Sequence, residues 1–293
     1  MRRLLAVAAV DLRRRSRSRV TLLVAVVAGL FGSMAAGDGA AVFYRVTPEA
    51  SEAISYAAVQ TPAMVGLETG LTATYALCIA GYFFFRGSLD HDHATGVDQL
   101  AATTPVSSVR ILLGKWVSHV VVLTVLLCVA ATTATLSHAG GGLAAANPVA
   151  VFGGVLLLGL PAGAFVAGIT LLFESTDRLD GTTGSVVYFL GLLLFFALVL
   201  QDYRGSATVV PFAVGVRDVF GNVAVYQLTV ESIRAVEPGY AGGSPGFFTT
   251  LLGTPRDVVG TFRYEGGPLP QWVVVHRTGL VAAGALLSAV GAV

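Results

Sequence analysis

The stretch from Val149 to Phe173 reads VAVFGGVLLLGLPAGAFVAGITLLF and contains no charged residue. A helix needs roughly 20 mostly apolar residues to cross the hydrocarbon core of a bilayer, because each residue rises about 1.5 Å. Every backbone N–H and C=O in that core must also be paired internally, which a helix achieves. The stretch therefore predicts a membrane-spanning helix, with Pro161 near its middle.

Five other stretches meet the same length test or come close to it: 20–36, 64–85, 116–136, 184–200 and 272–293. Their acidic, basic and histidine residues are few and lie near the predicted ends: Glu68, His119, His276 and Arg277. The sequence thus predicts an all-α polytopic membrane protein with six transmembrane helices. A long loop, 201–271, precedes the last of them.

The composition of the whole chain agrees with a membrane protein. Of its 293 residues, 55% are hydrophobic and 12% are charged, and the mean hydropathy is +0.76. A soluble domain usually has about 25% charged residues. The net charge of +1 argues against a nucleic-acid partner. Cys78 and Cys128 both lie in apolar runs, so neither a disulfide framework nor a zinc site is predicted.

Arginines near the span ends predict the orientation. Seven precede the first span (Arg2, Arg3, Arg13, Arg14, Arg15, Arg17 and Arg19), whereas the loop after it, 37–63, has only Arg45. Positive residues favour the cytoplasmic side, so the N-terminus is expected in the cytoplasm. Alternation then places 86–115 and 174–183 inside, and 37–63, 137–148 and 201–271 outside.

Residues 1–19 form a separate cytoplasmic unit in this interpretation. Leu4, Leu5, Val7, Ala8 and Leu12 recur at roughly helical spacing, ahead of the arginine cluster. Such a pattern is typical of a helix that lies on the inner leaflet with its arginines on anionic headgroups. A disordered basic tail and a cleaved signal peptide are the alternatives.

The cytoplasmic segment between the second and third spans, from Arg86 to Trp116, reads RGSLDHDHATGVDQLAATTPVSSVRILLGKW. Val97 and Leu100, with Ala101, share the apolar face of a short helix. Thr104 is a good N-cap and Pro105 suits the first position of a second helix. That helix is expected to run through Gly114 and Lys115 into the third span, which makes a helix-turn-helix.

The same segment resembles the permeases of ABC-2 type transporters. The resemblance rests on Thr95-Gly96, Leu100, Thr104-Pro105-Val106 and Arg110-Ile111-Leu112-Leu113-Gly114-Lys115. It implies that 20–293 is the membrane domain of an ATP-driven exporter in a prokaryotic plasma membrane. It also implies a second permease half and a separate ABC ATPase subunit. The ATPase-coupling residues carried over from the motif are Gly96, Val97, Leu100, Thr104, Pro105, Arg110, Gly114 and Lys115.

The chain itself has no nucleotide-binding loop. Its single lysine, Lys115, follows Gly114, but Val109 stands where a P-loop needs its first glycine, and Trp116 replaces the Ser or Thr. We therefore expect no enzymatic activity and no cofactor in this chain. ATP and magnesium are expected on the partner ATPase.

Other motifs point to packing or solvated loops. Gly242–Gly246 matches the G-x-S-x-G pattern but lies in a Gly/Pro-rich loop, without the strand and helix that a hydrolase needs. Asp90–His93 are consecutive and converge poorly on one ion, so no metal site is predicted. Glu68 is the ionisable residue that we expect most to face a translocation path. Close helix contacts are expected at Gly66, Gly70, Gly159, Gly163 and Gly168.

One alternative from another class remains at this stage. The chain could be an ATP-independent polytopic membrane protein, either a secondary carrier or a membrane assembly factor. Carriers usually show a repeated half and charged residues at mid-membrane, and neither is evident here. A membrane enzyme is a third, more distant interpretation.

Overall fold

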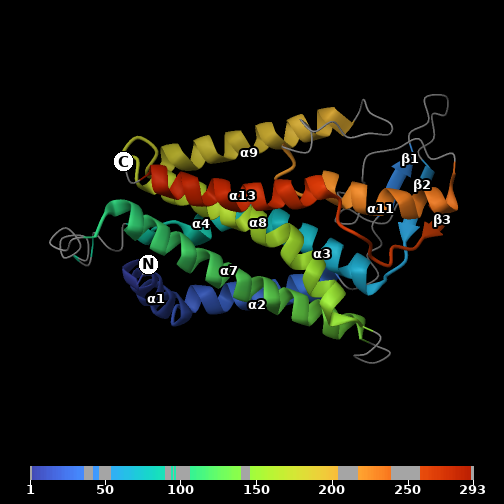
Figure 1. Ribbon diagram of the computed structural model, residues 1–293, viewed down its shortest axis with the longest axis horizontal. Coiled ribbons are helices and arrows are strands. Elements are labelled where there is room, and N and C mark those ends of the chain that lie inside the picture. Colours follow the sequence, from blue (N-terminus) through green and yellow to red (C-terminus); the bar gives the residue numbers. More distant parts are fainter. Residues whose placement is uncertain are drawn as a thin grey trace.

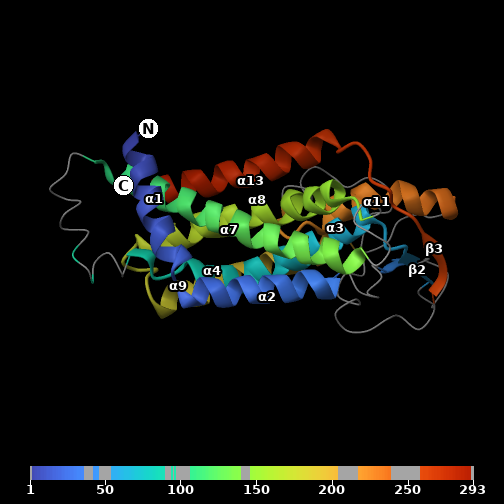
Figure 2. The same cartoon turned by 90° about the horizontal axis from the view of Figure 1, so that it is seen from below.

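The computed structural model describes residues 2–35, 42–45, 54–89, 94, 96, 106–139, 146–203, 217–238 and 258–291. Its main body is a bundle of long helices that run side by side (Figures 1 and 2). These are α2 (Arg19–Ala35), α3 (Pro62–Ala76) with its continuations η1 (Leu77–Gly81) and α4 (Tyr82–Phe85), α7 (Ser108–His138), α8 (Pro148–Glu174), α9 (Thr182–Tyr203) and α13 (Gln271–Val290).

Four helical stretches are long and apolar enough to cross a membrane: Pro62–Phe85, Ser108–His138, Pro148–Glu174 and Gln271–Val290. The number rises to five if α1 (Arg2–Ser16) and α2, which are bent by 75°, count as one broken span. The described part of α9, Thr182–Leu198, is a shorter apolar helix. The class predicted from the sequence, a multi-pass helical membrane protein, is confirmed at this level. The count of six spans stays a prediction.

Helix α8 lies at the centre of the bundle and packs against α3, α7 and α13. Glycines make these contacts close. A Cβ on Gly66 would lie 2.8 Å from the carbonyl oxygen of Ala150, and one on Gly70 would lie 2.6 Å from that of Gly154. The predicted glycine contacts are confirmed throughout α8: Gly159 packs on Leu127, Gly163 on Leu123 and Gly168 on Gly284. Small residues let helix backbones approach where lipid supplies no hydrophobic drive.

A small three-stranded sheet, which the sequence did not predict, stands beside the otherwise helical fold. Strand β2 (Ile54–Ala58) pairs antiparallel with β1 (Val42–Arg45) and parallel with β3 (Val258–Phe262). All three strands carry β-branched or aromatic residues, which favour extended chain. The sheet joins segments about 200 residues apart (54–58 with 258–262). Because the pairing is long-range, no local sequence pattern predicts it. A further helix, α11 (Asn222–Val236), lies within the predicted loop 201–271.

The second helix of the predicted helix-turn-helix begins later than expected. The helix begins at Ser108, with Ser107 in extended conformation as its N-cap, rather than at Thr104 and Pro105. Backbone hydrogen bonds from Arg110 N and Ile111 N to the carbonyl oxygen of Ser107 close its first turn. As predicted, the helix continues without a break into the third span. Val97, Leu100, Thr104, Pro105 and Asp90–His93 lie outside the described residues, so the first helix of the motif remains a prediction.

The bundle has two chemically different ends (Figures 1 and 2). We call the end that carries α1, the end of α4, the start of α7 and the 174–182 connection the arginine end. The opposite end carries the sheet and α11, and we call it the sheet end. The segments that the predicted alternation places on the same side of the membrane thus lie at the same end of the bundle. Residues 2–16 form helix α1, as expected for an interfacial helix and not for a disordered tail.

Candidate functional site: a coupling network at the arginine end

Residues 86–89 follow α4 directly and begin the 86–115 segment. We call these four residues the root of that segment. The carboxylate of Glu174, at the end of α8, accepts hydrogen bonds from three successive root amides. Oε1 accepts from Gly87 N and from Ser88 N at 3.3 Å, and Oε2 accepts from Leu89 N at 3.1 Å. Gly87 has φ +81°, a conformation that suits glycine and turns the amides toward the carboxylate.

Lys115 of α7 holds the root from the other side. Its ammonium donates to the carbonyl oxygen of Ser88 at 3.0 Å and to the Ser88 hydroxyl at 3.1 Å. Lys115 is 2% exposed and Ser88 is fully buried. A hydrogen bond from a charged donor is stronger than one between neutral groups, so the root is fixed to α7 as well as to α8.

Arg86 extends the network to α9. Its guanidinium donates to the Ser185 hydroxyl at 2.9 Å, near the start of that helix. Close by, the rings of Tyr82 and Tyr188 stack with centroids 4.4 Å apart. One short segment between the second and third predicted spans thus touches α7, α8 and α9 at once.

Helix α1 docks on α7 beside the root. A Cβ on Gly114 would lie 2.9 Å from the side chain of Val7, so α1 seats directly against the backbone of α7. Polar groups complete the contact. Asp11 Oδ2 accepts from Arg15 Nε at 2.8 Å and from the Ser118 hydroxyl at 2.7 Å, and Arg15 donates to His119 Nε2.

The charges of this contact are compensated although they are buried. Burial by itself would raise the pKa of Asp11, but the Arg15 guanidinium and the Ser118 hydroxyl outweigh it and leave the pKa of Asp11 below its usual value. Because an arginine only donates, His119 accepts at Nε2 and is neutral, with its proton on Nδ1. The imidazole also stacks on Phe85, at a centroid distance of 4.9 Å.

The predicted coupling residues that the structure describes fall into two groups. Arg110 is exposed on the first turn of α7, and Gly96 has φ +69° with open space around its α-carbon. Gly114 and Lys115 are buried and contact α1 and the root. They therefore offer no surface to another protein. Their contacts join parts of this chain to one another. Four others, Val97, Leu100, Thr104 and Pro105, lie outside the described residues.

Glu68 lies in the second turn of α3, at the sheet end. It is 5% exposed and accepts a hydrogen bond from Gln60 Nε2 at 3.0 Å. Its position near the start of Pro62–Phe85 agrees with the sequence, and its role in translocation stays a prediction.

A second buried charge pair was not anticipated. Arg277 of α13 donates to Asp218 at 3.0 Å, and the two side chains are 3% and 0% exposed. Asp218 also accepts from the backbone of Gly221 at 2.9 Å and of Ala224 at 3.0 Å, which caps α11. Asn222 then donates to the Tyr75 hydroxyl at 2.7 Å. The pair thereby fixes α11 to the bundle.

The sequence contained partial signals for these contacts. Asp11 and Arg15 are spaced i, i+4 on one helix, which predicts an ion pair but not its burial. Glu174 follows the most apolar span directly, yet its three amide partners lie about 86 residues earlier, so no local rule finds them.

Within the described ranges, no three His, Cys, Asp or Glu side chains gather in a way that could hold a metal ion. No protein-family model matches the chain, and no curated protein matches it.

Proposed function

We propose that this chain is the membrane-spanning permease subunit of an ABC-2 type transporter. The resemblance of its 95–115 motif to that family implies export as the direction of transport. In this proposal the chain crosses the plasma membrane six times, with its N-terminus in the cytoplasm. Two permease halves enclose a path, and two separate ATPase subunits bind ATP and magnesium. The chain itself performs no hydrolysis.

The observation that supports this proposal best is the root of the 86–115 segment. A force applied to a loop moves a helix only if the loop is joined to it by contacts that do not yield. Here the root is held by Glu174 of α8 and Lys115 of α7. Arg86, the first residue of the root, is held by Ser185 of α9.

Helix α1 adds a second point of contact to the same unit. Asp11 and Arg15 lock it to Ser118 and His119 of α7. An ATPase that engages residues 94–110 therefore pushes on a unit that includes α1, the root and three bundle helices. Rigid displacement of packed elements is a common way to transmit such a change.

In the proposal, the ATPase engages the first turn of α7 and the residues before it. Arg110 is exposed on that turn, and Gly96 has a left-handed backbone conformation with φ +69°. In the proposal, Val97 and Leu100 add an apolar contact, because an apolar helix face exposed to cytoplasm would otherwise be costly. Glu68 is proposed to face the path at its outer end.

Purification of the chain with an ATPase encoded in the adjacent reading frame tests the proposal. We expect a complex with two copies of each subunit that hydrolyses ATP, and no hydrolysis by the chain alone. A matched ATPase with its P-loop lysine replaced should still bind but remain inactive. Robust hydrolysis by the purified chain alone, or failure of the two proteins to associate in the bilayer, would contradict the proposal.

A further inference from the structure

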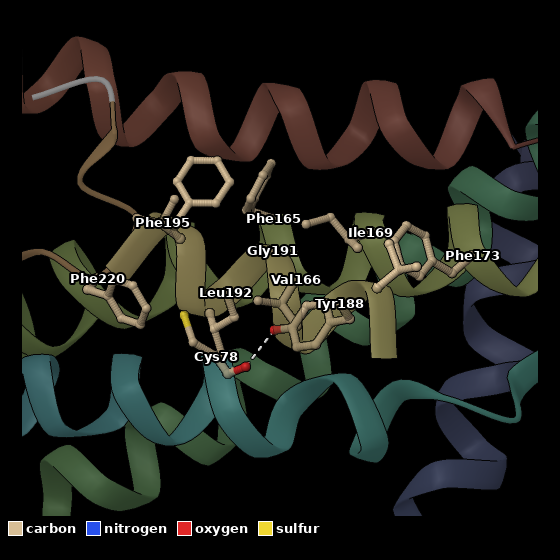
Figure 3. Close-up of a pocket in the computed structure, with 12 residues that line it drawn as sticks. Cys78, Phe165, Val166, Ile169, Phe173, Tyr188, Gly191, Leu192, Phe195 and Phe220 are labelled. Atoms are coloured by element: carbon tan, nitrogen blue, oxygen red, sulfur yellow. Dashed lines mark hydrogen bonds between the residues drawn. The ribbon is translucent and has the colours of Figure 1, made fainter. Parts of the chain in front are cut away.

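An apolar cavity of about 210 Å³ separates α9 from the rest of the bundle. Figure 3 shows its lining residues, which come from η1, α8, α9 and the segment before α11. Cys78, Val166, Ile169, Gly191, Leu192 and Phe220 are among them. The lining residues of α9, from Val187 to Phe195, lie in the middle part of that helix.

Aromatic contacts join α9 to α4 at one end of the cavity and to the segment before α11 at the other. At one end the ring of Tyr188 stacks on Tyr82, at 4.4 Å. At the other end Phe196 meets Phe220 edge to face, at 5.7 Å. Gly191 lies between Tyr188 and Phe196, and a Cβ placed on it would find no atom within 4 Å. The absence of a side chain at Gly191 thus helps to keep the space open.

The π-helical turn Leu77–Gly81 shapes the wall opposite α9. It redirects the carbonyl of Cys78 toward α9, where the Tyr188 hydroxyl donates to it at 2.5 Å (Figure 3). π-Turns inside α-helices are frequent at functional sites. The two strongest hydrogen-bonding groups of the wall therefore satisfy each other, and the remaining lining presents hydrocarbon.

Water is a poor occupant of such a space. A buried water needs two to four polar partners, and apolar cavities of this size stay dry and take up apolar molecules. A helix of a second copy, about 10–12 Å across with its side chains, is too wide to enter. Val187 and Phe195 are 42% and 39% exposed and mark the mouth on α9. An apolar chain from the bilayer fits both the chemistry and the access.

We propose that this cavity is a binding site for one hydrocarbon chain of a bilayer phospholipid, inserted between α9 and the π-turn of the second predicted span. The chain supplies the dispersion contacts that an empty cavity would lack. It would fix the spacing of α9 from α3 and α8. Lipid binding at this site needs no ATPase partner, so the experiment that tests it is independent of the proposed transporter function.

A phosphatidylcholine with a diazirine at mid-chain is the probe. The purified full-length protein is reconstituted with the probe, irradiated, and the labelled peptides are identified by mass spectrometry. We expect labelling of the lining residues Ile169 and Leu192 in the wild type. Gly191→Phe fills the cavity and should lower that labelling at least fivefold.

The matched control is Gly279→Phe on α13. Gly279 is exposed, has no atom within 4 Å of an added Cβ, and does not line the cavity. It should leave labelling at Ile169 and Leu192 unchanged. Leu192→Ala, which enlarges the cavity, should retain or increase labelling of Ile169, so the proposal is testable even if Gly191→Phe fails to fold.

Three results would overturn the proposal. One is labelling confined to the outward-facing Leu190 and Leu194, which are 61% and 59% exposed. Another is equal labelling of Ile169 in the wild type and in Gly191→Phe. The third is efficient cross-linking of Val187→Cys between two copies of the chain together with loss of lipid labelling, because a partner side chain would then occupy the cavity.

Discussion

Lys115 and Glu174 hold the same residue from two different helices. The Lys115 ammonium donates to the carbonyl oxygen and hydroxyl of Ser88, and Glu174 accepts from the Ser88 amide at 3.3 Å. The two charged groups thus bind opposite polar groups of one buried backbone unit. Their arrangement makes the root of the 86–115 segment part of the bundle, which is what a coupling element requires.

Replacement of Lys115 by methionine should loosen the root. The substitution keeps the volume of the side chain but removes two hydrogen bonds from a charged donor, each of a kind worth about 1.5–3 kcal/mol. We expect faster hydrogen exchange of the amides of Ser88 and Leu89 and a lower melting temperature. Arg110→Met is the matched control, because Arg110 is exposed and should change neither quantity. Unchanged exchange at Ser88 in Lys115→Met would show that the ammonium does not hold the root.

Acid should release α1 from α7. The pKa of Asp11 is lowered in the folded protein, because Arg15 and Ser118 outweigh the effect of burial. A carboxyl with a lowered folded pKa contributes stability that is present above its unfolded pKa, about 3.9, and is lost as the pH falls through its folded value. Protease cleavage within α1 should therefore rise as the pH falls below about 4.

Asp11→Asn serves as the test of that assignment. The amide cannot ionise, so we expect α1 to be easier to cleave at pH 7 and the acid-dependent increase to be smaller than in the wild type. A wild-type pH profile in Asp11→Asn would assign the transition to another carboxyl group.

The buried pair Asp218–Arg277 should matter far more than an exposed pair of the same type. Removal of one partner leaves an uncompensated buried charge, which typically costs about 3–5 kcal/mol. Asp218→Ala also removes the cap of α11. Arg263 and Glu265 form the matched exposed pair, with side chains 67% and 59% exposed, and such pairs contribute about 0–1 kcal/mol. Thermal unfolding in detergent should separate Asp218→Ala from Glu265→Ala clearly; equal melting temperatures would contradict the proposed anchoring of α11.

The two ends of the bundle should be accessible from opposite sides of the membrane. In a background with Cys78→Ala and Cys128→Ala, Gly267→Cys at the sheet end should react with an impermeant thiol reagent in intact cells. Asp177→Cys at the arginine end should react only after lysis. Both positions are exposed. Ser88, by contrast, is fully buried, so a cysteine there should not react with the reagent from either side of the membrane. Labelling of Asp177→Cys in intact cells would reverse the expected orientation.

The sequence predicted the long helices well because length and apolar composition are local properties. The spans at 64–85, 116–136, 149–173 and 272–293 correspond to Pro62–Phe85, Ser108–His138, Pro148–Glu174 and Gln271–Val290. The contacts between Gly66, Gly70 and α8 followed from the same reasoning about close packing.

Long-range contacts escaped prediction. The pairing of Ser55 with Val258 in the sheet has no local signature. Neither does the contact between Arg15 and His119, whose partners lie 104 residues apart. The start of α7 was placed too early because Thr104 and Pro105 are favourable cap residues, whereas Ser107 takes that position. Propensity alone does not choose between neighbouring caps.

The central claim is that an ATPase subunit docks on residues 94–110 and moves the bundle through the root. Its most direct test is the affinity of the ATPase for wild-type chain and for Leu100→Asp, with Leu269→Asp, an exposed leucine at the sheet end, as control. Burial of one leucine contributes about 1.5–3 kcal/mol, and about 1.4 kcal/mol is a factor of ten in affinity. We predict that Leu100→Asp weakens binding at least tenfold while Leu269→Asp binds normally. Wild-type affinity in Leu100→Asp would contradict the account.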